Sequence, residues 1–132
     1  MIKSHNEWDT LKEVFVGVVN GAHNPKLGKD LHCINYADKD NLHGIQQGLY
    51  PQQVIEETQE DLENFVNQLE SFGIKVRRPK PQNQEEYFSS PHWDTNGYYN
   101  YCPRDSVLIV GDTIIESPMA LRSRYFETFC FR

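Results

Sequence analysis

The chain has 132 residues, a formal net charge of −6 at pH 7 and a pI near 5.3. This length fits one domain, so we expect residues 1–132 to fold as a single domain with a substantial core. The sequence is 38% hydrophobic and 24% charged, which is too apolar for a disordered protein. Its acidic balance, without a long basic stripe, makes nucleic acid and anionic membranes poor partners.

The beginning of the sequence and the cysteines indicate the compartment. MIKSHNEWDT has neither the apolar stretch of a signal peptide nor the Arg-rich, acid-poor composition of a transit sequence. No stretch approaches the ~20 apolar residues of a membrane span. Cys33, Cys102 and Cys130 are far apart without C-x-x-C spacing, which indicates reduced thiols. We therefore predict a cytoplasmic protein.

The first half of the chain predicts a strand, a long loop and a helix. Residues 13–19, EVFVGVV, form a nearly continuous apolar run, typical of a strand covered on both faces. Residues 20–50 show no clean period and are expected to form a long irregular excursion, which could cover a site or a neighbouring subunit. Pro51 opens a helix whose apolar residues recur at three- and four-residue steps up to Phe72, and Gly73 suits its C-terminal cap.

The second half predicts more strands. Residues 74–79 alternate apolar and basic side chains, which indicates a short strand with one buried face. Residues 79–103 are rich in proline and aromatic residues and should form an extended loop. Residues 107–110 and 113–116 flank Gly111-Asp112, a two-residue turn that predicts a buried hairpin. The expected fold is mixed α/β.

Residues 119–132 have the pattern of the start of a further element, which the end of the sequence interrupts. Leu121, Tyr125 and Phe129 lie at four-residue steps, as in the first turns of an amphipathic helix. No Gly, Asn or Pro stop signal follows the last periodic residue. The alternative is a C-terminal helix docked on the core, but we favour a sequence that continues in a longer polypeptide.

Asp105 is the best candidate for a binding residue. It follows the stiff Pro103 immediately before the predicted buried strand, where its side chain can point into a cleft. A carboxylate there could pair bidentately with a guanidinium group. The alternative is a turn residue that bonds nearby backbone amides, or a salt bridge to Arg104 or Arg122.

Other chemistry receives less support from the residues. His92-Trp93-Asp94 and His32-Cys33 are the places where a histidine lies close to another possible metal ligand, and neither has the i, i+3 or i, i+4 spacing of a zinc site on a helix. We therefore predict no metal site. A Cys-His nucleophile pair stays open, because its members need only meet in space, and the sequence prefers none of the three cysteines.

Three stretches together resemble the glycine and inosamine-phosphate amidinotransferases. They are NEWD at 6–9 with the following TLKEVFVG, GIKVRRP at 73–79, and CPRDSVLIVGDTIIESPMALRSRYFE at 102–127. The match is closer than that to arginine deiminases or dimethylarginine hydrolases, and it covers only the opening part of the family's polypeptide. The resemblance implies the first module of a pentein-type five-bladed αβ propeller, incomplete in this chain, around a central polar channel.

The resemblance also implies a reaction. In that family a cysteine attacks the guanidino carbon of L-arginine, ornithine leaves from an amidino-cysteine intermediate, and an amine such as glycine takes the amidino group. Asp105 matches one of the carboxylates that hold the guanidinium, and is the predicted substrate-binding residue. The family's catalytic Cys, His and Asp belong to motifs beyond residue 132. We therefore predict no catalytic residue in this chain, no cofactor, and no transfer by the chain alone.

The implied partners are L-arginine or another guanidino compound, the missing C-terminal modules and a possible homo-oligomer. Two alternatives stay open. The chain could be a non-catalytic remnant that binds guanidino compounds or a partner protein, with an exposed apolar patch and a tendency to self-associate. It could instead be a module of a pentein hydrolase of the arginine deiminase type, which releases citrulline. The residues do not identify the amine acceptor.

Overall fold

A computed structural model describes residues 2–132. Its strands form four separate two-stranded sheets, and within these residues no sheet closes on itself. One pair is parallel and three are antiparallel: β1 (Glu13–Phe15) with β4 (Lys75–Arg77), then β2 (His23–Asn24) with β3 (Gly48–Leu49), β5 (Phe88–Ser89) with β6 (Asp94–Thr95), and β7 (Val107–Val110) with β8 (Thr113–Glu116). The helices are α1 (Lys29–Asn35), α2 (Gln52–Ser71), α3 (Pro103–Ser106) and the 3-10 helices η1 (Arg122–Arg124) and η2 (Glu127–Phe131). The mixed α/β content agrees with the prediction.

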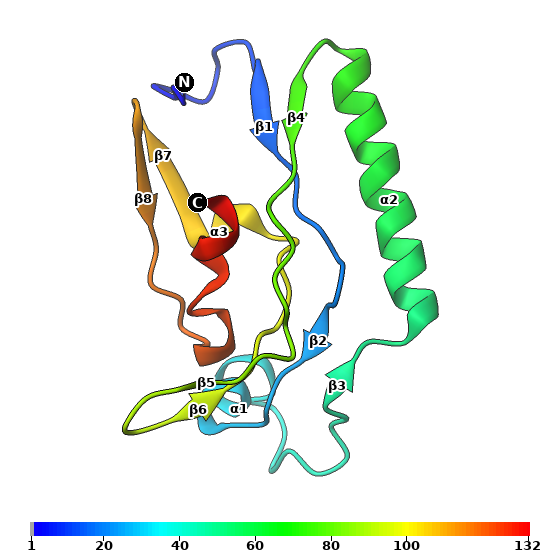
Figure 1. Ribbon diagram of the computed structural model, residues 1–132, viewed down its shortest axis with the longest axis vertical. Coiled ribbons are helices and arrows are strands. Elements are labelled where there is room, and N and C mark those ends of the chain that lie inside the picture. The colour runs from blue at the N-terminus through cyan, green and yellow to red at the C-terminus, as the bar shows by residue number, and fades with distance from the viewer. Residues whose placement is uncertain (1) are drawn as a thin grey trace.

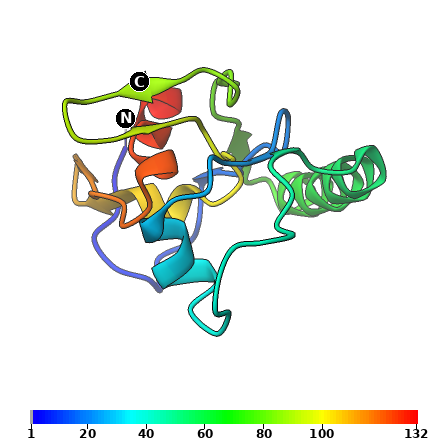
Figure 2. The ribbon, with the colours of Figure 1, turned by 90° about the horizontal axis from the view of Figure 1, so that it is seen from below.

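The long helix α2 is confirmed at both ends. Pro51 precedes it, and Gly73 follows it with a φ of 77°, a backbone conformation that suits glycine. Since β1 and β4 run parallel, the connection between them must cross over, and α2 lies in that connection. Figure 1 shows α2 beside β4, and Figure 2 shows it extending away from the rest of the chain. In the described part of the chain, no helix has the length and apolar character needed to cross a membrane.

The first strand is shorter than the predicted 13–19. It ends at Phe15, although Val16, Val18 and Val19 beyond it are buried. The chain here changes partner: the Val16 N–H donates to the Arg77 carbonyl oxygen at 2.9 Å, and the Val18 N–H donates to that of Asn100 at 3.1 Å. The apolar run is therefore buried as predicted. Its backbone bonds first to the segment of Arg77 and then to that of Asn100, so it does not form one continuous strand pairing.

The sequence predicted that residues 20–50 are irregular, but part of this segment is regular. It contains the seven-residue helix α1 and the short strands β2 and β3. Leu31 of α1 is 1% exposed and packs with Tyr98 and Leu121 at the centre of a hydrophobic cluster. The sequence did not predict this helix, because two turns are too short to show a helical period of apolar residues.

The predicted hairpin forms, but its predicted burial is wrong. Strands β7 and β8 pair in register around Gly111, whose φ is 62°. Leu108 lies opposite Ile115, and these side chains share one face with Val110. All three are about half exposed, because no element among residues 2–132 covers that face. In Figure 1 the hairpin and α2 stand on opposite sides of the molecule.

Residues 119–132 form the two 3-10 helices η1 and η2 instead of the predicted start of an amphipathic α-helix. Of the predicted apolar stripe only Leu121 is buried, whereas Tyr125 and Phe129 are about half exposed. Arg124 and Glu127 are buried in their place. The i, i+3 alignment of a 3-10 conformation brings these two side chains to the same side of the segment, where they neutralise each other.

Candidate functional site

Asp105 lies in α3, a single helical turn, and not at the start of a strand as expected. Pro103 begins this turn, and the Asp105 N–H donates to the Cys102 carbonyl oxygen at 3.1 Å. The next residue, Ser106, is 1% exposed, and its carbonyl oxygen accepts the Ser117 N–H at 2.9 Å. The turn that carries Asp105 is therefore fixed to both ends of the β7–β8 hairpin.

The Asp105 carboxylate already has a guanidinium partner within the chain. Its Oδ2 accepts a hydrogen bond from Arg124 Nη1 at 3.0 Å, while its Oδ1 lies 3.8 Å from Nε of the exposed Arg104. The Asp105 side chain keeps 32% of its surface exposed. The predicted alternative of a salt bridge thus applies chiefly to Arg124, not to Arg122, whose guanidinium lies over the Trp93 ring at 5.8 Å.

Arg124 is held in turn by a buried carboxylate. Its Nε and Nη2 donate to the two carboxylate oxygens of Glu127 at 2.7 and 2.8 Å, and the two side chains are 7% and 4% exposed. Burial alone would lower the pKa of Arg124, but the hydrogen bonds and charge of Glu127 outweigh it and raise that pKa. Burial raises the pKa of Glu127, against the effect of Arg124. Arg124 is therefore a permanent, fixed cation.

Sequence analysis missed Arg124 and Glu127 as members of this group. The available signal was the i, i+3 spacing of these two residues within RSRYFE at 122–127. This stretch follows shortly after the predicted hairpin, which brings the chain back toward Asp105. The interpretation as an amphipathic α-helix hid it, because that pattern assigns both charges to solvent. Opposite charges three residues apart can instead be buried together when both carboxylate oxygens accept a hydrogen bond from the guanidinium.

Two of the three thiols have environments that oppose nucleophilic activation. Cys33 is exposed and Cys130 is buried. Burial, with a smaller effect of Glu127, raises the pKa of Cys130 to about 12, and its Sγ donates to the Glu127 carbonyl oxygen at 2.8 Å. Burial and the Asp105 charge also raise the pKa of Cys102. Because the thiolate is the reactive form, both shifts oppose nucleophilic attack.

One residue of each pair considered as metal ligands, His32 and Asp94, has an ordinary partner within the chain. His32 Nε2 donates to the Lys39 carbonyl oxygen at 2.7 Å, and Asp94 pairs with Lys26. The described residues bring no three side chains of His, Cys, Asp or Glu into a group that could hold a metal ion.

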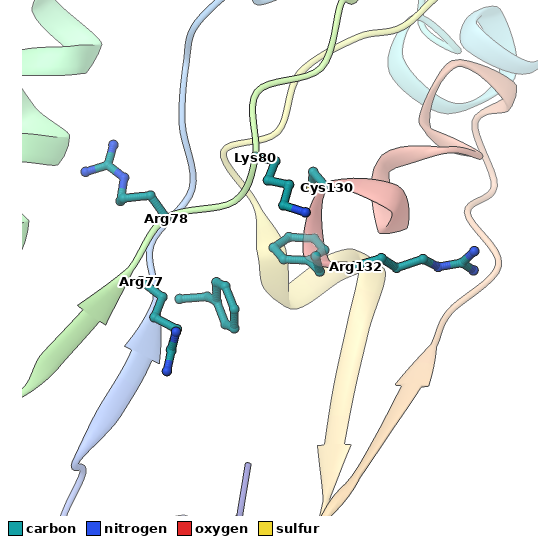
Figure 3. Close-up of a pocket in the computed structure, with 7 residues that line it drawn as sticks. Arg77, Arg78, Lys80, Cys130 and Arg132 are labelled. Atoms are coloured by element: carbon teal, nitrogen blue, oxygen red, sulfur yellow. The ribbon is translucent and has the colours of Figure 1, made fainter. Parts of the chain in front are cut away.

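A cavity of about 380 Å³ opens beside the end of η2 and has several basic residues around it. Figure 3 shows that the guanidinium groups of Arg78 and Arg132 point away from it in opposite directions. Each is paired with a carboxylate, Arg78 with Glu63 and Arg132 with Glu116. The charges around this cavity are therefore largely neutralised outside it, and its walls do not include Asp105.

Comparison with known proteins shows which enzymes the chain is similar to. No family model matches the chain. It is 42% identical to inosamine-phosphate amidinotransferase 1 of Streptomyces griseus, an alignment that covers 100% of this chain and 38% of the relative. It is 40% identical to the L-arginine:L-lysine amidinotransferase of Pseudomonas savastanoi pv. phaseolicola, covering 98% of this chain and 36% of that protein.

A solved structure gives the same result. The inosamine-phosphate amidinotransferase structure from Streptomyces griseus superposes with a TM-score of 0.94 at 41% identity, over 100% of this chain and 38% of that one. The chain thus spans 38% of the length of the first relatives that it matches. Over its whole length, the chain belongs to the amidinotransferase family.

Proposed function

We propose that this chain forms one wall of the active site of an enzyme that moves the amidino group of L-arginine to an amine acceptor through an amidino-cysteine intermediate. The observation that carries the proposal is the homology of the entire chain to proteins named amidinotransferases. On this proposal the chain is the first module of a pentein-type αβ propeller. In the Streptomyces griseus relative, 62% of the length has no counterpart in these 132 residues, and the catalytic Cys, His and Asp would lie in that part.

Asp105 is the proposed contact to the substrate. Its partial exposure leaves a carboxylate oxygen accessible, and α3 fixes its position against the hairpin. A carboxylate that faces a guanidinium gains a charge-assisted hydrogen bond, worth about 1.5–3 kcal/mol. Such a contact orients the guanidino carbon toward an attacking thiolate supplied by another part of the enzyme.

The chemistry of the thiols supports the proposal that the chain alone does not transfer amidino groups. Cys102 and Cys130 have raised pKa values, so each is overwhelmingly protonated at neutral pH. Cys33 is exposed on α1. Positioning and attack are both required, and Asp105 contributes only to the first.

A titration of the 132-residue chain with L-arginine, followed by amide chemical shifts, tests the binding role. L-Citrulline is the matched control ligand, because it has nearly the same shape without the positive charge. We expect L-arginine to shift signals around α3, L-citrulline to shift them much less, and Asp105→Ala to weaken arginine binding about tenfold. Asp112→Ala, in the exposed hairpin turn, should leave the affinity unchanged. Equal affinity of wild type and Asp105→Ala would remove Asp105 from the site.

The reaction itself is tested on the chain joined to, or mixed with, the remaining part of a family polypeptide. Incubation with L-arginine and candidate amines should produce ornithine together with an amidinated amine. Formation of citrulline instead would favour a hydrolase of the arginine deiminase type, which needs the same guanidinium-holding carboxylate. Product analysis by mass spectrometry separates the two and identifies the acceptor.

A further inference from the structure

We propose that Arg124 is a positioning residue: it binds Oδ2 of Asp105 and thereby presents Oδ1 of that carboxylate to a guanidino ligand. This inference rests on the proposed function, and it adds a residue that does not touch the ligand. Arg124 reaches Asp105 across 19 positions in the sequence, with Nη1 at 3.0 Å from Oδ2.

Arg124 is itself immobile, which a positioning residue must be. Glu127 holds two of its three guanidinium nitrogens, and the Tyr99 ring lies 4.9 Å from its Cζ. A guanidinium fixed by a bidentate carboxylate and an aromatic face loses little further entropy when it binds another group. The position of Asp105 Oδ2 is therefore set by the Arg124–Glu127 pair, whose two side chains are each more than nine-tenths buried.

The two oxygens of Asp105 have different surroundings. Oδ2 faces the buried Arg124, whereas Oδ1 lies toward Arg104, whose side chain is 95% exposed. Oδ1 is thus the oxygen on the solvent side. It follows that Asp105 accepts one hydrogen bond from the ligand instead of the bidentate pair expected from the sequence, and that the other ligand N–H groups find their acceptors elsewhere.

A double-mutant cycle separates positioning from general support of the fold. Arg124→Lys should weaken L-arginine binding about tenfold in the wild-type background, because an ammonium cannot bind Glu127 and Asp105 in the same geometry. In the Asp105→Asn background the same substitution should change affinity less than twofold. An equal loss in both backgrounds would show a merely structural effect and overturn the inference. Glu127→Gln keeps the shape of the cluster and serves as a second variant if Arg124→Lys does not fold; it should weaken binding by several-fold only when Asp105 is present.

A second readout does not depend on ligand binding. In ¹⁵N spectra of the unliganded chain, a guanidinium held by two carboxylates should show separate, slowly exchanging Nη signals for Arg124. Asp105→Asn should shift the Arg124 Nη1 signal and leave the signals of Arg122 in place, since Arg122 lies over Trp93. Unchanged Arg124 signals would overturn the inference. If wild type binds no L-arginine while these signals respond as expected, the proposed function fails and the Arg124–Asp105 contact stands.

Discussion

Asn96 donates a hydrogen bond from its side-chain amide to Nε2 of His23 at 2.5 Å. The amide orientation is fixed, because Oδ1 of the same side chain accepts the Lys26 N–H at 2.7 Å. Nε2 is therefore an acceptor, and the proton of the neutral imidazole lies on Nδ1. His23 is 6% exposed, and its Nδ1 has no hydrogen-bond partner among the described residues. Protonation of Nε2 would set two donors against each other in a buried site.

This geometry predicts that acid destabilises the protein through His23. Burial lowers the pKa of His23, against a smaller effect of Glu85. A histidine with a depressed folded pKa stabilises the fold above its unfolded pKa of about 6.5, and this stability is lost as pH falls through the folded pKa, by at most about 1.4 kcal/mol per pH unit. In urea unfolding, the difference in stability between wild type and His23→Gln should show this loss between pH 7.5 and 5. Comparison with the variant is needed because the raised pKa of Glu127 acts with the opposite sign in both proteins. His43→Gln, at an exposed loop position, should keep the wild-type pH profile. Identical pH profiles for wild type and His23→Gln would contradict the assignment.

The three cysteines should differ in alkylation rate. Cys33 is exposed and should react first with iodoacetamide at pH 8. Cys102, with its pKa raised by burial and by the nearby Asp105, should react more slowly. Cys130, with a pKa of about 12 and a buried Sγ, should react only after unfolding. Peptide mass spectrometry over time measures the order, and urea-unfolded protein, in which all three should react alike, is the control. Early modification of Cys130 in the folded chain would contradict the buried position of η2.

Local sequence signals predicted the elements that depend on local chemistry. Pro51 and Gly73 delimited α2 correctly, and Gly111 located the hairpin turn, because caps and turns are set by neighbouring residues. The burial of the hairpin was predicted wrongly because burial depends on distant parts of the chain and not on neighbouring residues. Whether the face of Leu108 and Ile115 is covered depends on which other element packs there, and nothing in the hairpin sequence states that.

The candidate site shows the same division. The sequence predicted that Asp105 directly precedes the hairpin and could bind a guanidinium, but it did not predict the helical turn α3 that carries Asp105. The partner of that carboxylate was not predicted either, since Arg124 reaches it only after the chain has passed through the hairpin. A helical pattern also misled the interpretation of 119–132, because the structure buries the Arg124–Glu127 pair and leaves Tyr125 and Phe129 about half exposed.

Gly17 should tolerate no side chain. A Cβ at this position would lie 2.3 Å from the backbone of Tyr101, which cannot move without disturbing the neighbouring Val18–Asn100 bridge. We expect Gly17→Ala to lower the free energy of unfolding by about 3 kcal/mol or more, at or above the usual cost of overpacking. The control is Gly28→Ala, where the added Cβ meets chiefly the side-chain oxygen of Asp30, and a loss below about 1 kcal/mol is expected. Chemical denaturation compares the two, and equal losses would contradict the close approach of the two segments.

The exposed face of the hairpin should make the 132-residue chain self-associate. Leu108, Val110 and Ile115 share this face, with exposed fractions of 54%, 55% and 46%. Apolar side chains gathered on an uncovered sheet face favour contact with another such surface. Sedimentation velocity at increasing protein concentration should therefore show a rising mean mass, and Leu108→Lys should shift association to higher concentrations. Ile34→Lys, an equally exposed apolar position on α1, is the matched control and should behave as wild type. If the chain stays monomeric at every concentration, or if both substitutions act alike, the hairpin face is not an association surface. If association is lost when the remaining part of a family polypeptide is supplied, that part covers the same face.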